Sequence, residues 1–190
     1  MVKNSGNKEA SEENVTLDDD IDVSKKNTKR SVSVRRRQMR ARMWPEVSDD
    51  VLWLRTKNVG FTTIPRTLPH INKILDKHAG KGFPVSATYL SLWCRVFDEG
   101  FVEIRNPRDL AHESGFSGPR AEATWRNRMR ILADLGVIDA KPGVKGDFQY
   151  VLMFNPLQVI AKIYANDQTD FDYCSLLDRM MQVGAEDIPY

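Results

Sequence analysis

The chain has 190 residues, with 28 Lys and Arg against 26 Asp and Glu, a hydrophobic content of 41%, four Trp and eight Phe. This composition fits one modestly sized domain with extensions. No apolar run approaches the roughly 20 residues of a membrane helix, the polar start has no signal-peptide pattern, and the two cysteines lack a C-x-x-C spacing. We therefore expect a reduced, cytoplasmic protein that is associated with the nucleoid in a bacterium or is nuclear in a eukaryote.

The charge is strongly segregated along the chain. Residues 1–24 carry seven acids against two lysines, residues 25–42 carry nine Lys and Arg with no acid, and residues 164–190 carry six acids against one Arg. Dense blocks of like charge are typical of solvated tails, and basic blocks often contact nucleic acid. We predict a disordered tail over residues 1–42, acidic and then basic. Arg35, Arg36 and Arg37 are its candidate DNA contacts, and a nuclear-import signal or RNA contact fits the same tract.

Residues 43–83 are predicted to form a helical extension. Apolar residues at i, i+3 and i+4 spacing predict a helix over 68–79, which Gly80 and Gly82 end. A second helix is expected from Pro84, with Ser86 as a candidate cap, to Gly100. Its predicted buried stripe comprises Tyr89, Leu92, Trp93, Val96 and Phe97.

The next segment alternates strand-like and helical patterns. Residues 101–104 are β-prone, and Asn106 and Pro107 then begin a helix that Gly115 ends. The sequence "GFSG" predicts a tight corner, followed by a helix over 119–135 with Gly136 at its end. Two strand-like runs joined by "PGVKG" predict a hairpin. One face of the second strand is expected to carry Phe148, Tyr150, Leu152 and Phe154.

Two helices are predicted in the C-terminal segment, residues 155–190. The first has Val159, Ile160, Ile163 and Tyr164 inward, and the second, over 170–183, carries an apolar stripe of Phe171, Cys174, Leu177 and Met181. Both are too apolar on one side to stand alone. We expect them to complete the core or to form a homodimer, which two-fold DNA sites favour.

This order of elements over residues 84–154 resembles the winged helix-turn-helix fold. The likeness lies in "LAHESGFSGPRAEATWRNRMRILADLGVI" and the following "DAKPGVKGDFQYVLMF". It implies a mostly α fold with a small hairpin or three-stranded sheet, flanked by the tail and the C-terminal helices. In that family the second helix of the pair enters the DNA major groove, and the hairpin, or wing, touches the adjacent backbone or minor groove.

The helix over 119–135 has two contrasting faces at about 100° per residue. Apolar residues, including Trp125, share one side, and Arg128 lies close to them, where we expect its stem to pack or its charge to pair with an acid. The opposite side carries the candidate DNA contacts Arg120, Ala123, Asn127 and Arg130, flanked by Thr124 and Arg126. Arg suits guanine, Asn suits adenine, and Ala allows close approach. A solvated polar face of a good helix former is the alternative.

In the predicted hairpin, Lys141 and Lys145 flank a loop that contains Gly143 and Gly146. Glycine allows close approach to a sugar–phosphate surface, and lysine supplies a point charge. Solvated lysines on an ordinary hairpin are the alternative. Both lysines are nevertheless candidate contacts to the DNA backbone.

No motif for catalysis, metal or cofactor is present. The three His are scattered, "GFSGP" departs from G-x-S-x-G, and "PGVKG" is too short for a phosphate-binding loop. We therefore expect a non-enzymatic, sequence-specific binder of double-stranded DNA without cofactors, most simply a transcriptional regulator. A plasmid or mobile-element replication or partition factor, and a winged-helix protein–protein interaction module, are the alternatives.

Overall fold

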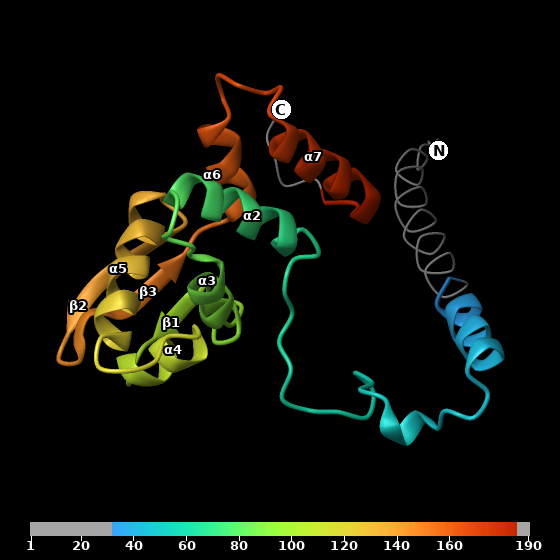
Figure 1. Ribbon diagram of the computed structural model, residues 1–190. Coiled ribbons are helices and arrows are strands. Elements are labelled where there is room, and N and C mark those ends of the chain that lie inside the picture. Colours follow the sequence, from blue (N-terminus) through green and yellow to red (C-terminus); the bar gives the residue numbers. More distant parts are fainter. Residues whose placement is uncertain (1–31, 186–190) are drawn as a thin grey trace, which may run out of the picture. The chain divides into compact units, whose positions relative to one another are not determined.

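The computed structural model describes residues 32–185, which divide into two compact units between Val59 and Gly60. The first unit contains a helix over residues 32–43 and a short 3₁₀ turn, η1 (Asp49–Val51), as Figure 1 shows. The remaining described residues belong to the second unit. The domain boundaries expected from the sequence, after residues 42, 83 and 154, stay predictions.

The helix over residues 32–43 replaces the disorder that the sequence predicted there. The prediction gave weight to like charge, but Arg, Met, Gln and Ala, which fill most of this stretch, are strong helix formers. Arg40 also donates to Asp49 at 2.5 Å, which offsets part of the repulsion among the arginines. The rest of the predicted tail, residues 1–31, lies outside the described residues.

The second unit is mostly helical around a small antiparallel sheet, as predicted. The strands β1 (Phe101–Glu103), β2 (Ile138–Gly143) and β3 (Gly146–Met153) are ordered β1-β3-β2. The helices are α2 (Leu68–Ala79), α3 (Ser86–Trp93), α4 (Pro107–Glu113), α5 (Ala121–Asp134), α6 (Pro156–Ile163) and α7 (Phe171–Val183). The bounds of α2 match the predicted helix.

Helix α2 is the centre of the core. Its residues Ile71, Ile74 and Leu75 are fully buried, and they come from the stripe that the sequence indicated. Figure 1 shows α2 between the pair α6–α7 and the group formed by α3, α4 and α5. One hydrophobic cluster therefore spans the unit, and the C-terminal helices complete it.

Helix α3 is shorter than predicted and has a different cap. Asp76, on α2, accepts hydrogen bonds from the backbone N–H groups of Val85 and Ser86 at 2.6 and 2.8 Å, whereas Ser86 caps nothing. The helix ends at Trp93, and the amide of Gly100 closes a turn on the carbonyl of Phe97. This turn leads the chain into β1 and leaves Phe97 80% exposed, so its predicted burial was wrong.

The corner between α4 and α5 forms as the sequence indicated. The side chain of Asn106 accepts the amide of Arg108 at 3.1 Å and caps α4. Gly115 and Gly118 have φ of +82° and +80°, a region that glycine enters without strain. The guanidinium of Arg95 ion-pairs with Glu113 at the end of α4 and lowers the pKa of that carboxyl.

Strand β3 buries residues of both alternating sets, Phe148 on one face and Val151 on the other. Val151 is fully buried and pairs with Val102 of β1, whereas Tyr150, Leu152 and Phe154 are 36–43% exposed. Only Phe148 of the predicted face is buried. Both alternating sets of β3 contain apolar residues, so the local pattern alone does not show which of them are buried.

Helix α7 buries a different face from the predicted one. It buries Tyr173, Leu176 and Met180, whereas Phe171 and Met181 are 76% and 72% exposed. Cys174 is also exposed, and Leu177 is only partly buried. The N-terminal end of α7 also forms ion pairs with α2. Lys77 contacts Asp170 at 2.6 Å and Asp172 at 3.3 Å, and Lys73 contacts Asp172 at 2.8 Å.

The ion pair between α2 and α7 predicts a dependence of stability on acid pH. The hydrogen bond from Lys77 lowers the pKa of Asp170 from 3.8 to about 2. A lowered carboxyl pKa stabilises the fold above the unfolded value, and the stabilisation is lost as the pH falls through the folded value. In Lys77→Met we expect a smaller fall in the free energy of unfolding between pH 4 and pH 2 than in the wild type.

Urea unfolding at a series of pH values measures this effect. Lys162→Met, which removes an exposed lysine from α6, is the matched control and should keep the wild-type pH profile. Equal pH profiles for Lys77→Met and the wild type would contradict the prediction.

Candidate nucleic-acid interface

Trp125 anchors α5 to the core. Its side chain is fully buried and meets Phe148 of β3 edge to face, with ring centroids 6.0 Å apart and an angle of 78°. Met129 and Leu132, one and two turns further along the helix, are also fully buried. The apolar side of α5 therefore faces the core, as the sequence predicted.

Arg128 fixes the same helix from a second direction. Its Nε donates to the carbonyl of Pro84 at 2.9 Å, and an Nη donates to the carbonyl of Gly82 at 3.3 Å. Its guanidinium lies 5.0 Å from the centroid of Phe83 and 5.8 Å from that of Phe116. Arg128 is 7% exposed, so its stem packs as expected, with carbonyl oxygens and aromatic rings as its partners.

The opposite side of α5 is uncovered. We call Arg120, Ala123, Asn127 and Arg130 the α5 ridge. Arg120, Ala123 and Arg130 are exposed, and Asn127 is half-buried. Thr124 and Arg126, which flank the ridge, are also half-buried. The ridge combines two exposed guanidinium groups, an amide and a small residue on one helix face.

Arg126 is held against the hairpin formed by β2 and β3. Its Nη2 and Nε lie 2.8 and 3.2 Å from Oε1 of Glu122, and its Nη1 lies 4.0 Å from Oδ2 of Asp147. A Cβ on Gly146 would be 3.0 Å from Nη1, so the missing side chain of Gly146 makes room for this guanidinium. Arg126 therefore connects α5 with the hairpin and is only 26% exposed.

The hairpin itself has a two-residue tip braced by a glutamine. The amide of Lys145 donates to Oε1 of Gln149 at 2.9 Å, and Gln149 is only 7% exposed. A Cβ on Gly143 would overlap the same oxygen. Val144 at the tip is 97% exposed, and Lys141 and Lys145 are also exposed. Lys145 thus occupies a defined turn, and Lys141 lies in β2 opposite Tyr150.

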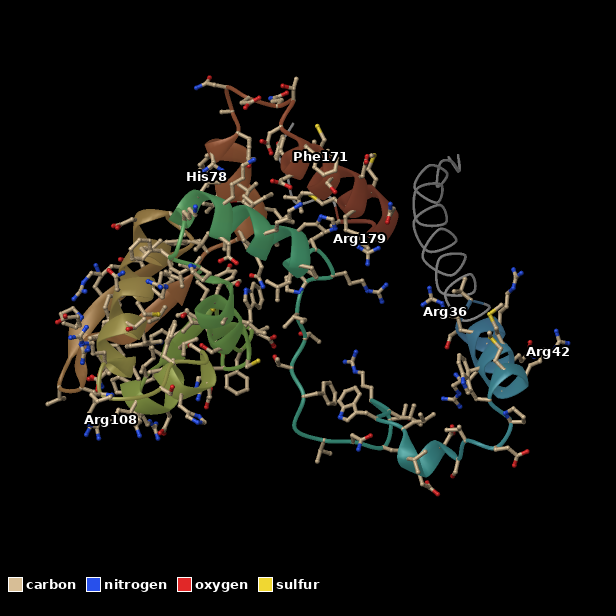
Figure 2. The ribbon with its side chains drawn as sticks, in the orientation of Figure 1. Arg36, Arg42, His78, Arg108, Phe171 and Arg179 are labelled. Atoms are coloured by element: carbon tan, nitrogen blue, oxygen red, sulfur yellow. The ribbon has the colours of Figure 1, made fainter. Side chains whose placement is uncertain are left out.

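The sequence analysis missed three charged residues at this surface: Arg108, Glu122 and Asp147. Glu122 bridges Arg126 and, at 3.8 Å, Nε of Arg108, whose side chain is 87% exposed. The i,i+4 spacing of Glu122 and Arg126 was a usable signal. Figure 2 shows Arg108 on a part of the unit distant from Phe171 and Arg179 of α7.

The predicted DNA contacts fall into two groups. Those of α5 and the hairpin all belong to the second unit, where the contact of Arg126 with Asp147 joins the two elements. Arg35, Arg36 and Arg37 belong to the first unit, where all three are exposed on the helix over residues 32–43. Figure 2 labels Arg36 and Arg42 on that helix.

Other kinds of site are less developed in the described part of the chain. A pocket of about 620 Å³ has an apolar lining that includes Trp93, Phe97 and Phe154, and its only ionisable lining residues are Arg66 and Asp98. Residues 32–185 contain no cluster of His, Cys, Asp and Glu suited to a metal ion. Over the same range, no helix is both long and apolar enough to cross a membrane.

Comparisons with known proteins supply no relative for this chain. No protein-family model, no curated protein and no solved structure matches it.

The two arginines on opposite sides of α5 should behave differently when replaced. Arg128→Ala leaves two carbonyl groups without their donor, and we expect it to lower the free energy of unfolding by about 1–3 kcal/mol. Arg130→Ala removes an exposed side chain and should change it by no more than about 0.5 kcal/mol. Urea unfolding followed by circular dichroism measures both, and equal losses would contradict the assignment of Arg128 to the core.

Proposed function

We propose that the protein is a sequence-specific binder of double-stranded DNA with a winged helix-turn-helix module, acting as a transcriptional regulator. In this proposal α5 enters the major groove and the hairpin lies on the adjacent backbone. The observation that carries it is the orientation of α5, which buries Trp125 and leaves Arg120, Ala123 and Arg130 exposed. Two arginines, an alanine and an asparagine on one uncovered face supply the groups that base recognition in a groove requires.

The chemistry of the α5 ridge supports recognition of base edges. An arginine can donate two parallel hydrogen bonds to guanine, and an asparagine can pair in the same way with adenine. Ala123 offers no bulk between Arg120 and Asn127, so the helix can approach the groove closely. Phosphate contacts from Thr124, Lys141 and Lys145 would set the register without reading the sequence. Arg126, the other flanking candidate, is paired with Glu122 in the free protein.

The helix over residues 32–43 extends the proposal. Its exposed Arg35, Arg36 and Arg37 would add phosphate contacts and steepen the salt dependence of binding. An import signal and RNA contact remain the alternatives for this tract. The homodimer through the C-terminal helices also stays a prediction, with Phe171, Cys174 and Met181 exposed on α7.

Selection of bound duplexes from a random pool, followed by mobility-shift titration at several salt concentrations, tests the proposal. We expect a selected sequence and a steep salt slope. Arg130→Ala should weaken binding of the selected duplex by about 1–3 kcal/mol. Arg179→Ala is the matched control, because Arg179 lies on α7 and donates to Gln182 within that helix.

The outcomes separate the competing functions. If Arg120→Ala and Arg130→Ala leave all DNA binding intact, or if no duplex is retained, the ridge instead suits an acidic protein partner. If the bound duplexes carry several closely spaced copies of one short motif, a replication or partition role would be favoured over transcriptional regulation.

A further inference from the structure

Two acids, Glu122 and Asp147, lie close to the guanidinium of Arg126. Glu122 precedes Arg126 by one helical turn and binds it through two nitrogens, at 2.8 and 3.2 Å. Asp147 approaches the same guanidinium from the hairpin, at 4.0 Å. Two carboxylates therefore surround the one arginine that lies between the proposed groove-binding helix and the proposed backbone-binding hairpin.

Glu122 also opposes a second arginine. Its Oε2 lies 3.8 Å from Nε of Arg108, which belongs to α4 and is 87% exposed. The carboxylate of Glu122 is 34% exposed, so it places negative charge on a surface otherwise suited to a polyanion. Glu122 therefore weakens the attraction of this surface for phosphate.

We infer that Glu122 is a positioning residue, which holds Arg126 on the hairpin and thereby limits the affinity of this surface for DNA of any sequence. The inference rests on the proposed function. Gly146 contributes to this arrangement, because the absence of its Cβ lets the guanidinium of Arg126 lie against the hairpin backbone. Arg126 thus connects α5 with the hairpin, and its charge is already paired in the free protein.

The energetic reason is that phosphate contacts carry no sequence information. A free arginine adds a similar contact to every duplex, so it raises affinity for random DNA and for the selected duplex together. The base contacts of the α5 ridge do not change. Holding Arg126 in an ion pair keeps this sequence-independent contribution low, so the absolute affinity for random DNA is lower while the ratio of specific to non-specific affinity is unchanged.

Glu122→Gln tests the inference, because glutamine keeps the size of the side chain and removes its charge. With a random 30-base-pair duplex, we expect the slope of log K against log salt to steepen by about 0.9 for each arginine released, Arg126 alone or Arg126 with Arg108. The loss of affinity between 50 and 200 mM salt should grow by about threefold for each arginine released. The preference for the selected duplex over the random one should keep its wild-type value, because the released arginine adds a similar contact to both.

Two further variants give the test its controls. Asp178→Asn makes the same change of charge at an exposed position of α7 and should keep the wild-type slope. Arg126→Ala in the Glu122→Gln background should remove the part of the steepening that comes from Arg126. Thermal unfolding of each variant checks that the fold is retained, a property that a change in salt slope does not report.

The results distinguish the inference from the function beneath it. A wild type that binds duplex DNA together with an unchanged slope in Glu122→Gln would overturn the inference alone. Steepening that persists in full in Glu122→Gln/Arg126→Ala would also overturn it, since simple repulsion by Glu122 would then explain the effect. If the wild type binds no duplex at all, the proposed function fails as well.

Discussion

The burial of Trp125 is the constraint on which the surface of this protein depends. Its contact with Phe148 fixes α5 against the sheet, and Met129 and Leu132 extend the same contact along the helix. Successive helical side chains differ in direction by about 100°, so fixing one side chain fixes all the others. The exposure of Arg120, Ala123 and Arg130 is therefore a consequence of how the opposite side packs.

Arg128 makes this orientation more secure. A helix held by apolar contacts alone can still adjust its rotation, because such contacts have little directional preference. Hydrogen bonds from Arg128 to the carbonyls of Gly82 and Pro84 add that direction, and the rings of Phe83 and Phe116 shield the guanidinium. Arginine thus has a structural task on one side of α5, and we propose a binding task on the other.

Sequence patterns predicted elements well where a single apolar stripe or a local cap was present. Helix α2 matched its prediction, and Asn106 and Gly136 have the terminal roles that their positions indicated. The predicted stripe of α7 was wrong, because a second apolar set of that helix is the buried one. Strand β3 also carries two apolar sets, and it buries residues of both.

Contacts between distant residues account for the other errors. Asp76 caps α3 from the preceding helix, and Asp147 reaches Arg126 from the hairpin, so neither partner was visible in a short window. The ion pair of Glu122 with Arg126 was visible, because it follows the i,i+4 rule. The composition of the α5 ridge came directly from the sequence, whereas its role in recognising DNA stays a prediction.

The separation of tasks on α5 bears on how this protein can evolve. The residues that hold the helix in place and those of the α5 ridge are different, so the ridge can accumulate substitutions at little cost in folding stability. Lineages that carry this scaffold would then diverge in the ligand they select while retaining one architecture. Among homologues, substitutions should accordingly concentrate at the α5 ridge, Arg120, Ala123, Asn127 and Arg130. Trp125 and Arg128 should be conserved.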